Sequence, residues 1–172
     1  LPPFIRHTSC PATPATSLSK VCPHQTTVPS GGFFSWALEF FFPAAWRAAM
    51  PPQSRHAFSV EKLLREGVVF FVTRFGGVLA GCGGIKMFGA EYGEVKRMFV
   101  RPVFRGKGLG KAMLSHLAEY ARTRDASVLR LETGIYEVDA IGLYERFGFQ
   151  RRAPFGEYVE DPLSVYFEKN IG

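Results

Sequence analysis

A glycine-rich loop with basic residues is the part of this sequence most suited to binding a charged ligand. The loop runs Arg105-Gly106-Lys107-Gly108-Leu109-Gly110, follows an expected strand from Glu94 to Val100, and leads into an amphipathic helix. The first N–H groups of a helix have no partner within it, so a strand–loop–helix junction gathers donors that can hold a diphosphate. Glycine lets the main chain approach the anion and adopts the positive φ that such loops use. Arg105, Lys107 and Lys111 add positive charge, so the loop predicts a phosphate-bearing ligand.

The glycine spacing disfavours two common nucleotide-binding classes. A dinucleotide-binding fingerprint needs an acid about twenty residues after the loop, and Glu132 lies at a workable distance. The order here is Arg-x-x-Gly-x-Gly, however, and lacks the first glycine pair of that fingerprint. No Gly-Lys-Ser/Thr follows the loop either, which argues against a P-loop hydrolase.

Three separated motifs resemble those of the GNAT superfamily of N-acetyltransferases. The loop resembles its acyl-CoA signature, Gln/Arg-x-x-Gly-x-Gly/Ala, and the stretch from Glu94 to Val100 resembles its central strand. Downstream, residues 140–149 resemble its Ala-x-x-Leu-Tyr-x-x-x-Gly-Phe helix. The resemblance covers residues 54–169 and has the motifs in the expected order.

This resemblance implies an α/β (α+β) GNAT fold, with a single mixed, mostly antiparallel central sheet flanked by helices. Residues 53–172 would form the acetyltransferase domain. Residues 1–52 would form an irregular N-terminal segment plus poorly defined first helices, because 1–32 are rich in Pro, Thr and Ser and Pro43 interrupts the next apolar stretch. The family's first strand is not evident there.

Hydrophobic periodicity and turn residues predict the remaining elements. The expected helices are 59–66, 108–124 and 139–147, and the expected strands are 68–75, 78–88, 93–100, 128–133 and 163–169.

The resemblance also implies that acetyl-CoA is the co-substrate. Main-chain groups of Met98, Phe99 and Val100 would pair with its pantetheine arm and polarise the thioester carbonyl. Its diphosphate would contact the loop residues Arg105, Gly106, Lys107, Gly108, Leu109, Gly110 and Lys111. One departure is Glu137, which stands where the family often has Asn. A carboxylate cannot donate as an amide does and would repel a phosphate, so Glu137 is not expected to contact the cofactor.

Tyr144 and Glu94 are the candidate catalytic residues that this resemblance assigns. Tyr144 matches the tyrosine that serves as general acid toward the departing thiolate in many family members. Glu94 begins the central strand, where some members carry a general base, and Glu132 or water is the alternative. By strand alternation, Glu94, Lys96, Met98 and Val100 are expected to share one face. For either carboxylate, a surface ion pair remains an alternative interpretation.

The function that follows is acetyl transfer from acetyl-CoA to a primary amine of an unidentified small molecule or protein, in a direct ternary complex. The alternative is a non-catalytic acyl-CoA-binding module of the same fold. The stretch from Lys96 to Arg130 is basic, as in many nucleic-acid-binding domains. That class is disfavoured, because a protein that binds in a groove of DNA or RNA needs no diphosphate-binding loop. A homodimer is an expectation carried by the resemblance alone.

Composition sets further bounds on the class of protein. The 172 residues carry a net charge of +6 and suit one domain. The three cysteines and four histidines show no metal-ligand spacing, so we expect reduced thiols, no metal and a cytoplasmic protein, with Cys82 a core residue. The sequence contains no span of about twenty apolar residues, so it does not predict a membrane-spanning helix.

Overall fold

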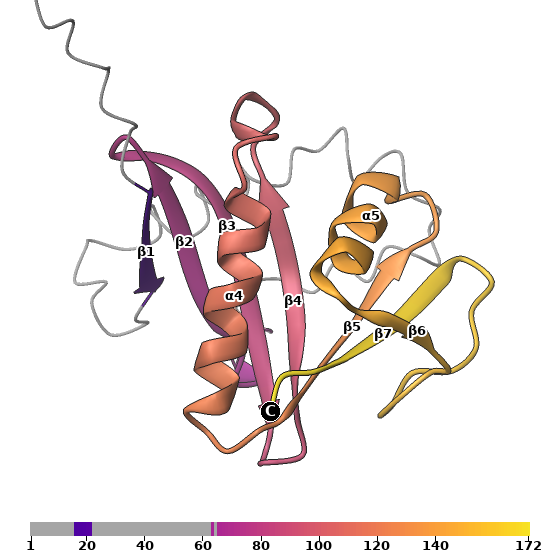
Figure 1. The fold of residues 1–172 in the computed structure, drawn as a ribbon. Coiled ribbons are helices and arrows are strands. Elements are labelled where there is room, and N and C mark those ends of the chain that lie inside the picture. Colours follow the sequence, from indigo (N-terminus) through magenta and orange to yellow (C-terminus); the bar gives the residue numbers. More distant parts are fainter. Residues whose placement is uncertain (1–15, 22–62, 64) are drawn as a thin grey trace, which may run out of the picture.

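A computed structural model describes residues 16–21, 63 and 65–172, and in this part of the chain seven strands form one sheet (Figure 1). The strand order is β1-β2-β3-β4-β5-β7-β6, and only the β4–β5 pair is parallel. The expectation of a single mixed, mostly antiparallel sheet is therefore confirmed. The elements are β1 (Thr16–Val21), β2 (Val69–Phe75), β3 (Val78–Phe88), β4 (Tyr92–Val100), the 3₁₀ helix η3 (Pro102–Phe104), α4 (Leu109–Arg122), β5 (Val128–Gly134), α5 (Val138–Phe147), β6 (Gln150–Arg152) and β7 (Ser164–Asn170).

Strand β1 corrects one expectation about the N-terminal segment. It pairs antiparallel with β2, from Thr16↔Phe75 to Val21↔Phe70, where the sequence predicted irregular structure. Its six residues are mostly Ser, Thr and Lys, so the partner strand rather than an apolar pattern defines it. The helices expected on either side of Pro43 lie outside the described residues, and the division after residue 52 stays a prediction.

The other predicted elements agree with the structure to within a few residues. The β2–β3 hairpin turns at Gly76 and Gly77, which both have positive φ, as their sequence predicted. Leu63 and Arg65 are helical, within the helix expected over 59–66, whose residues 59–62 and 64 are not described. Strand β6 was not predicted, because its three residues are too few to show a pattern.

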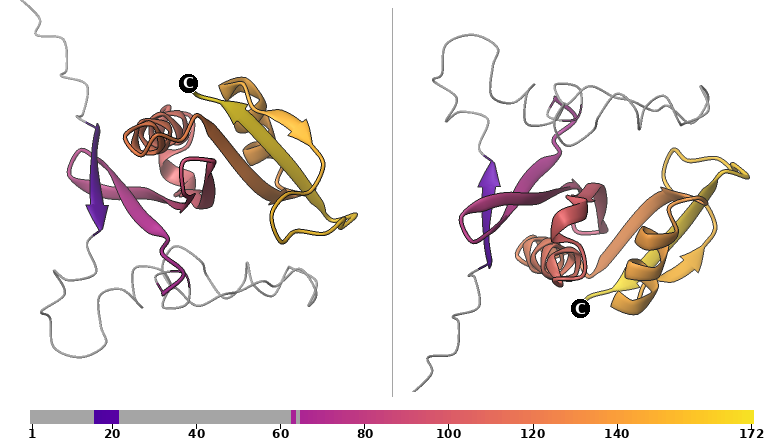
Figure 2. Two further views of the ribbon diagram at one scale, coloured as in Figure 1. Left: turned by 90° about the horizontal axis from the view of Figure 1, so that it is seen from below. Right: turned by 90° about the horizontal axis from the view of Figure 1, so that it is seen from above.

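Helices α4 and α5 cover the same face of the sheet, as both views in Figure 2 show. Met113, Leu114 and Leu117 of α4 recur at helical spacing and are almost fully buried. They pack in one core with sheet residues such as Ile85 and Leu131. Because each large apolar side chain contributes roughly 1.5–3 kcal/mol on burial, this packing holds α4, and with it the loop at its start, against the sheet.

Candidate functional site

Strands β4 and β5 pair at one end and then diverge, which opens the sheet (Figure 1). Their ladder consists of two pairs, Gly93↔Leu129 and Glu94↔Arg130. The part of β4 that follows, from Lys96 to Val100, lines a cleft of about 1990 Å³ together with the loop before α4, α5 and the segment between β6 and β7. A strand edge that leaves its neighbour presents main-chain groups to whatever enters the gap.

A β-bulge in β4 lies at the start of this divergence. Lys96 pairs with Gly84 and Phe99 with Cys82, so Arg97 and Met98 together face only Gly83. Arg97 has a φ of 52°, which is uncommon for a residue with a side chain. A bulge of this kind breaks the alternation of side chains along the strand.

The bulge overturns the expected face of Met98 and Val100. A Cβ on Gly83 would lie 2.7 Å from Met98 Sδ and 2.8 Å from Met113 Cγ, which places Met98 on the face covered by α4. Glu94 and Lys96 lie on the opposite face, because their neighbour Val95 packs into the α4 core. Strict alternation is therefore wrong beyond Lys96. Met98, Phe99 and Val100 all line the cleft, and the pairing of their main chain with a pantetheine arm stays a prediction.

The loop from Gly106 to Lys111 presents a row of unbonded main-chain donors. Arg105 N donates to Pro102 O and Ala112 N to Gly108 O, but none of the six N–H groups between them has a backbone acceptor among the described residues. Gly106 and Gly108 both have a φ of 75°, and no atom lies within 4 Å of the position a Cβ would take at either. Such a cradle at the start of a 14-residue helix fits a diphosphate.

Gly110 has a different structural reason to be small. A Cβ there would lie 2.8 Å from Leu143 Cδ2, so the absence of a side chain allows α4 to approach α5 closely. Its N–H still belongs to the first turn of α4. Gly110 therefore couples the loop to the helix that carries Tyr144.

Arg105 and Lys107, two of the three basic residues around the loop, have described partners of their own. Arg105 donates from Nε to the Val100 carbonyl at 3.2 Å and from Nη1 to Asp139 at 3.3 Å. The Lys107 ammonium lies 5.4 Å from the centre of the Phe75 ring. Lys111 is exposed on the first turn of α4. All three remain close enough to the loop to attract an anion.

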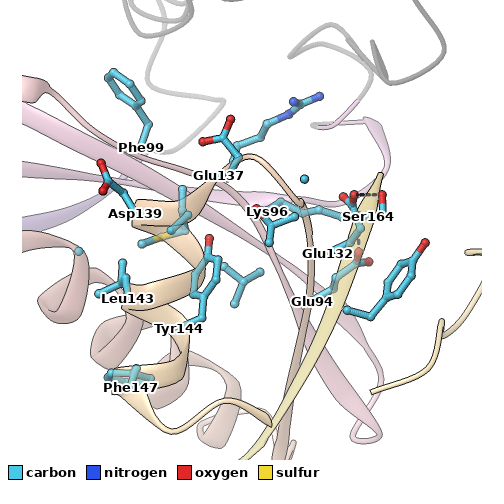
Figure 3. A pocket seen from close by; sticks show the side chains of 18 of the residues that line it. Glu94, Lys96, Phe99, Glu132, Glu137, Asp139, Leu143, Tyr144, Phe147 and Ser164 are labelled. Carbon is cyan, nitrogen blue, oxygen red and sulfur yellow. Dashed lines mark hydrogen bonds and ion pairs between the residues drawn. The ribbon is translucent and has the colours of Figure 1, made fainter. Parts of the chain in front are cut away.

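Tyr144 lies on the side of α5 that faces Lys96, Glu94 and Glu132 (Figure 3). It is buried, and its ring packs against Phe149 and Phe167, with centroid distances of 5.8 and 6.1 Å. Among the described residues, none forms a hydrogen bond with its hydroxyl. Burial raises the pKa of Tyr144, and the charges of Glu137 and Glu132 add to the effect. The residue is therefore a protonated phenol at neutral pH.

Glu94 is only 3% exposed and is held by two donors on the same oxygen. Its Oε1 accepts from Lys96 Nζ at 2.5 Å and from the Tyr158 hydroxyl at 2.7 Å, while Lys96 Nζ also donates to the Tyr158 oxygen at 2.8 Å. Burial and the Glu94 charge raise the pKa of Tyr158. Tyr158 was not predicted as a site residue, because it lies in an irregular segment without a recognisable pattern.

Glu132, the alternative base, lies beside this group and is less enclosed (Figure 3). Its Oε1 accepts from the Ser164 hydroxyl at 2.6 Å. The cleft thus brings Glu94, Glu132 and Tyr144 together, although they come from three different elements. Glu137 also lines the cleft, next to the start of α5.

These features agree with the comparison to known families, in which residues 33–149 match the model of the acetyltransferase (GNAT) family. The chain belongs to this family. An IAA acetyltransferase of Azospirillum brasilense is 42% identical over 122 residues, which cover 70% of this chain and 80% of the relative. The GNAT assignment made from the motifs is therefore confirmed, and the protein is an N-acetyltransferase enzyme.

Solved structures of GNAT proteins share the fold. A Klebsiella pneumoniae protein assigned to the acyl-CoA N-acyltransferases is 33% identical, with a TM-score of 0.65, and the match covers 91% of this chain and 98% of that one. A GNAT family acetyltransferase from Elizabethkingia anophelis, solved with acetyl-CoA bound, has a TM-score of 0.63 over 90% of this chain and 97% of its own. At 13% identity, that second likeness shows the fold alone.

Two further findings concern the residues that the structure describes. In these segments no three His, Cys, Asp or Glu side chains come together as a metal site would require. No helix there has the length and apolar character needed to cross a membrane.

Proposed function

We propose that this GNAT enzyme transfers the acetyl group of acetyl-CoA directly to a primary amine of a small molecule or protein. The observation that supports this most is the divergence of β4 from β5, with the unbonded loop amides at its end and Tyr144 and Glu94 beside it. Acetyl-CoA, when bound, supplies an acetyl group activated as a thioester.

Different segments of the chain would bind different parts of acetyl-CoA. Gly106 to Lys111 would hold the diphosphate through six N–H groups, with Arg105 and Lys107 nearby. The main chain of Met98, Phe99 and Val100 would align the pantetheine arm along the open edge of β4. Much of the rate enhancement can come from this alignment of two reactants.

Glu94 and Tyr144 each carry out one proton transfer, Glu94 as the base and Tyr144 as the acid. Glu94 removes a proton from the acceptor's ammonium, which frees the lone pair of the amine for attack. The new C–N bond forms as the thioester C–S bond breaks, and Tyr144 gives its hydroxyl proton to the departing sulfur. The amide nitrogen loses its second proton to solvent. Protonated Glu94 then releases its proton to solvent and Tyr144 takes one up, which restores both groups and leaves a net release of one proton. Because burial keeps Tyr144 protonated, the donor is present throughout the neutral range.

An assay of free thiol released from acetyl-CoA tests this function directly. The acceptors should be amino acids, polyamines, aromatic amines and peptides with a free N-terminus, together with IAA because the 42% identical relative is named an IAA acetyltransferase. We expect at least one primary amine to give turnover with N-acetylated product by mass spectrometry. Tight acetyl-CoA binding with no turnover across all amines would contradict the proposal.

A further inference from the structure

Tyr158 belongs to the segment between β6 and β7, far along the chain from the strand that carries Glu94. It also lies beyond residues 33–149, which the family model matches. Its hydroxyl nevertheless reaches Glu94 Oε1 at 2.7 Å and accepts from Lys96 Nζ at 2.8 Å. The three side chains close a triangle of hydrogen bonds beside the open edge of β4.

Packing fixes the position of the Tyr158 ring. The backbone N–H of Tyr158 donates to the Phe155 carbonyl at 3.0 Å. The Tyr158 ring centroid lies 5.1 Å from that of Phe155 and 5.6 Å from that of Tyr166. The Lys96 ammonium lies 5.2 Å from the centre of the same ring. A side chain held on several sides loses little further freedom when it forms a hydrogen bond, so it can hold its partner in a defined orientation.

The two donors act on one oxygen of the carboxylate. Lys96 and Tyr158 both donate to Oε1, and among the described residues none forms a hydrogen bond with Oε2. Because burial raises the pKa of Tyr158 and the neighbouring Glu94 charge adds to this, the phenol keeps its proton and remains a donor. The arrangement therefore satisfies one oxygen and leaves the other to interact with a ligand.

We propose that Tyr158, with Lys96, is a positioning residue that orients Glu94 so that Oε2 receives the proton of the acceptor amine. The inference rests on the proposed role of Glu94 as base. It also assigns a function to the segment between β6 and β7, which lines the cleft.

A double-mutant cycle of Tyr158→Phe and Glu94→Gln tests this role, with the amine from the panel above that releases thiol fastest as the acceptor. Tyr158→Phe alone should lower kcat about tenfold and leave the KM for acetyl-CoA within twofold. In the Glu94→Gln background the same substitution should lower kcat less than twofold, because its effect passes through the carboxylate. Tyr166→Phe is the matched control, since it removes a phenol of the same cluster that donates to the Val159 carbonyl instead.

The possible failures are distinguishable. Losses in kcat that multiply in the double variant would show that Tyr158 acts independently of Glu94 and would overturn the inference. An unchanged kcat for Tyr158→Phe, or an equal fall for Tyr166→Phe, would overturn it as well. Wild-type turnover in Glu94→Gln would instead remove the base assignment on which it rests. Unaltered acetyl-CoA affinity in each variant shows that the fold is intact.

Discussion

The Tyr144 hydroxyl is buried, yet no described residue bonds to it, whereas Glu94 beside it has two donors on one oxygen. An unbonded buried hydroxyl is costly unless something else uses it. We interpret the difference as a difference in role. The Tyr144 hydroxyl is available to hydrogen-bond with a ligand atom, whereas Glu94 is held in place by protein side chains.

Removal of the Tyr144 hydroxyl should affect chemistry more than binding. We expect Tyr144→Phe to lower kcat about 100-fold, the lower end of what general acids contribute, and to change the acetyl-CoA Kd less than twofold. Steady-state kinetics and calorimetry on the same preparation separate the two effects. A kcat within twofold of the wild type would exclude an acid role.

The raised pKa of Tyr144 predicts the alkaline side of the pH profile. Burial, with Glu137 and Glu132, raises this pKa above its usual value of about 10, and the acid form is the one that donates. The donor is therefore retained as pH rises, and kcat should show no fall below about pH 10. A kcat that halves between about pH 8 and 9 at saturating substrates would contradict Tyr144 as donor.

Cys82 should be inert, and this bears on the choice between direct and covalent transfer. Burial raises the pKa of its thiol to about 12, so almost no thiolate exists near neutral pH. We expect native protein at pH 8 to leave Cys82 unlabelled by iodoacetamide, and unfolded protein to label it fully, with peptide mass spectrometry as the readout. Rapid labelling in the native state would show a reactive thiol.

The loop before α4 and the divergence of β4 from β5 depend on backbone geometry that single residues control. Gly108 has positive φ and an open space where a side chain would project, and Gly67, which is not part of the loop, has nearly the same φ and a similarly open space. These two positions form a matched pair, because a side chain at either strains the backbone but meets no atom.

Gly108→Ala and Gly67→Ala should therefore separate strain from binding. Each should lower the free energy of unfolding by about 1–2 kcal/mol, the usual cost of a side chain in the left-handed region. Only Gly108→Ala should weaken acetyl-CoA binding, by tenfold or more, since its methyl group would enter the diphosphate cradle. Calorimetry gives the affinities and chemical denaturation the stabilities. Equal affinities in both variants would mean that the anion binds elsewhere.

The sequence predicts those elements whose side chains repeat at a regular spacing. The apolar residues of α4 and the β2–β3 hairpin with its two glycines are examples, and both are as expected. The bulge at Arg97 was not predictable, because it arises from how β4 pairs with β3. For the same reason the contact of Tyr158 with Glu94, 64 residues apart, leaves no local signal.

In the molecule as a whole, the two candidate catalytic residues lie on opposite faces of the sheet. Helices α4 and α5, with Tyr144, lie on one face of the sheet, while Glu94 and Lys96 lie on the other, and the gap between β4 and β5 joins them. This arrangement suits two reactants that are bound together, without an acyl group on the enzyme. Initial rates measured over a grid of acetyl-CoA and amine concentrations should therefore give intersecting double-reciprocal lines. Parallel lines, the pattern of a covalent enzyme intermediate, would contradict direct transfer.

Acetyl-CoA binding at the main-chain amides of Gly106 to Lys111 underlies every step of this mechanism. A ¹H–¹⁵N amide spectrum, recorded as acetyl-CoA is added to the protein, observes these six groups individually. We predict that their signals show the largest shifts in the molecule, in the direction of stronger hydrogen bonding. Saturable binding that leaves all six signals in place would show that the diphosphate is held elsewhere.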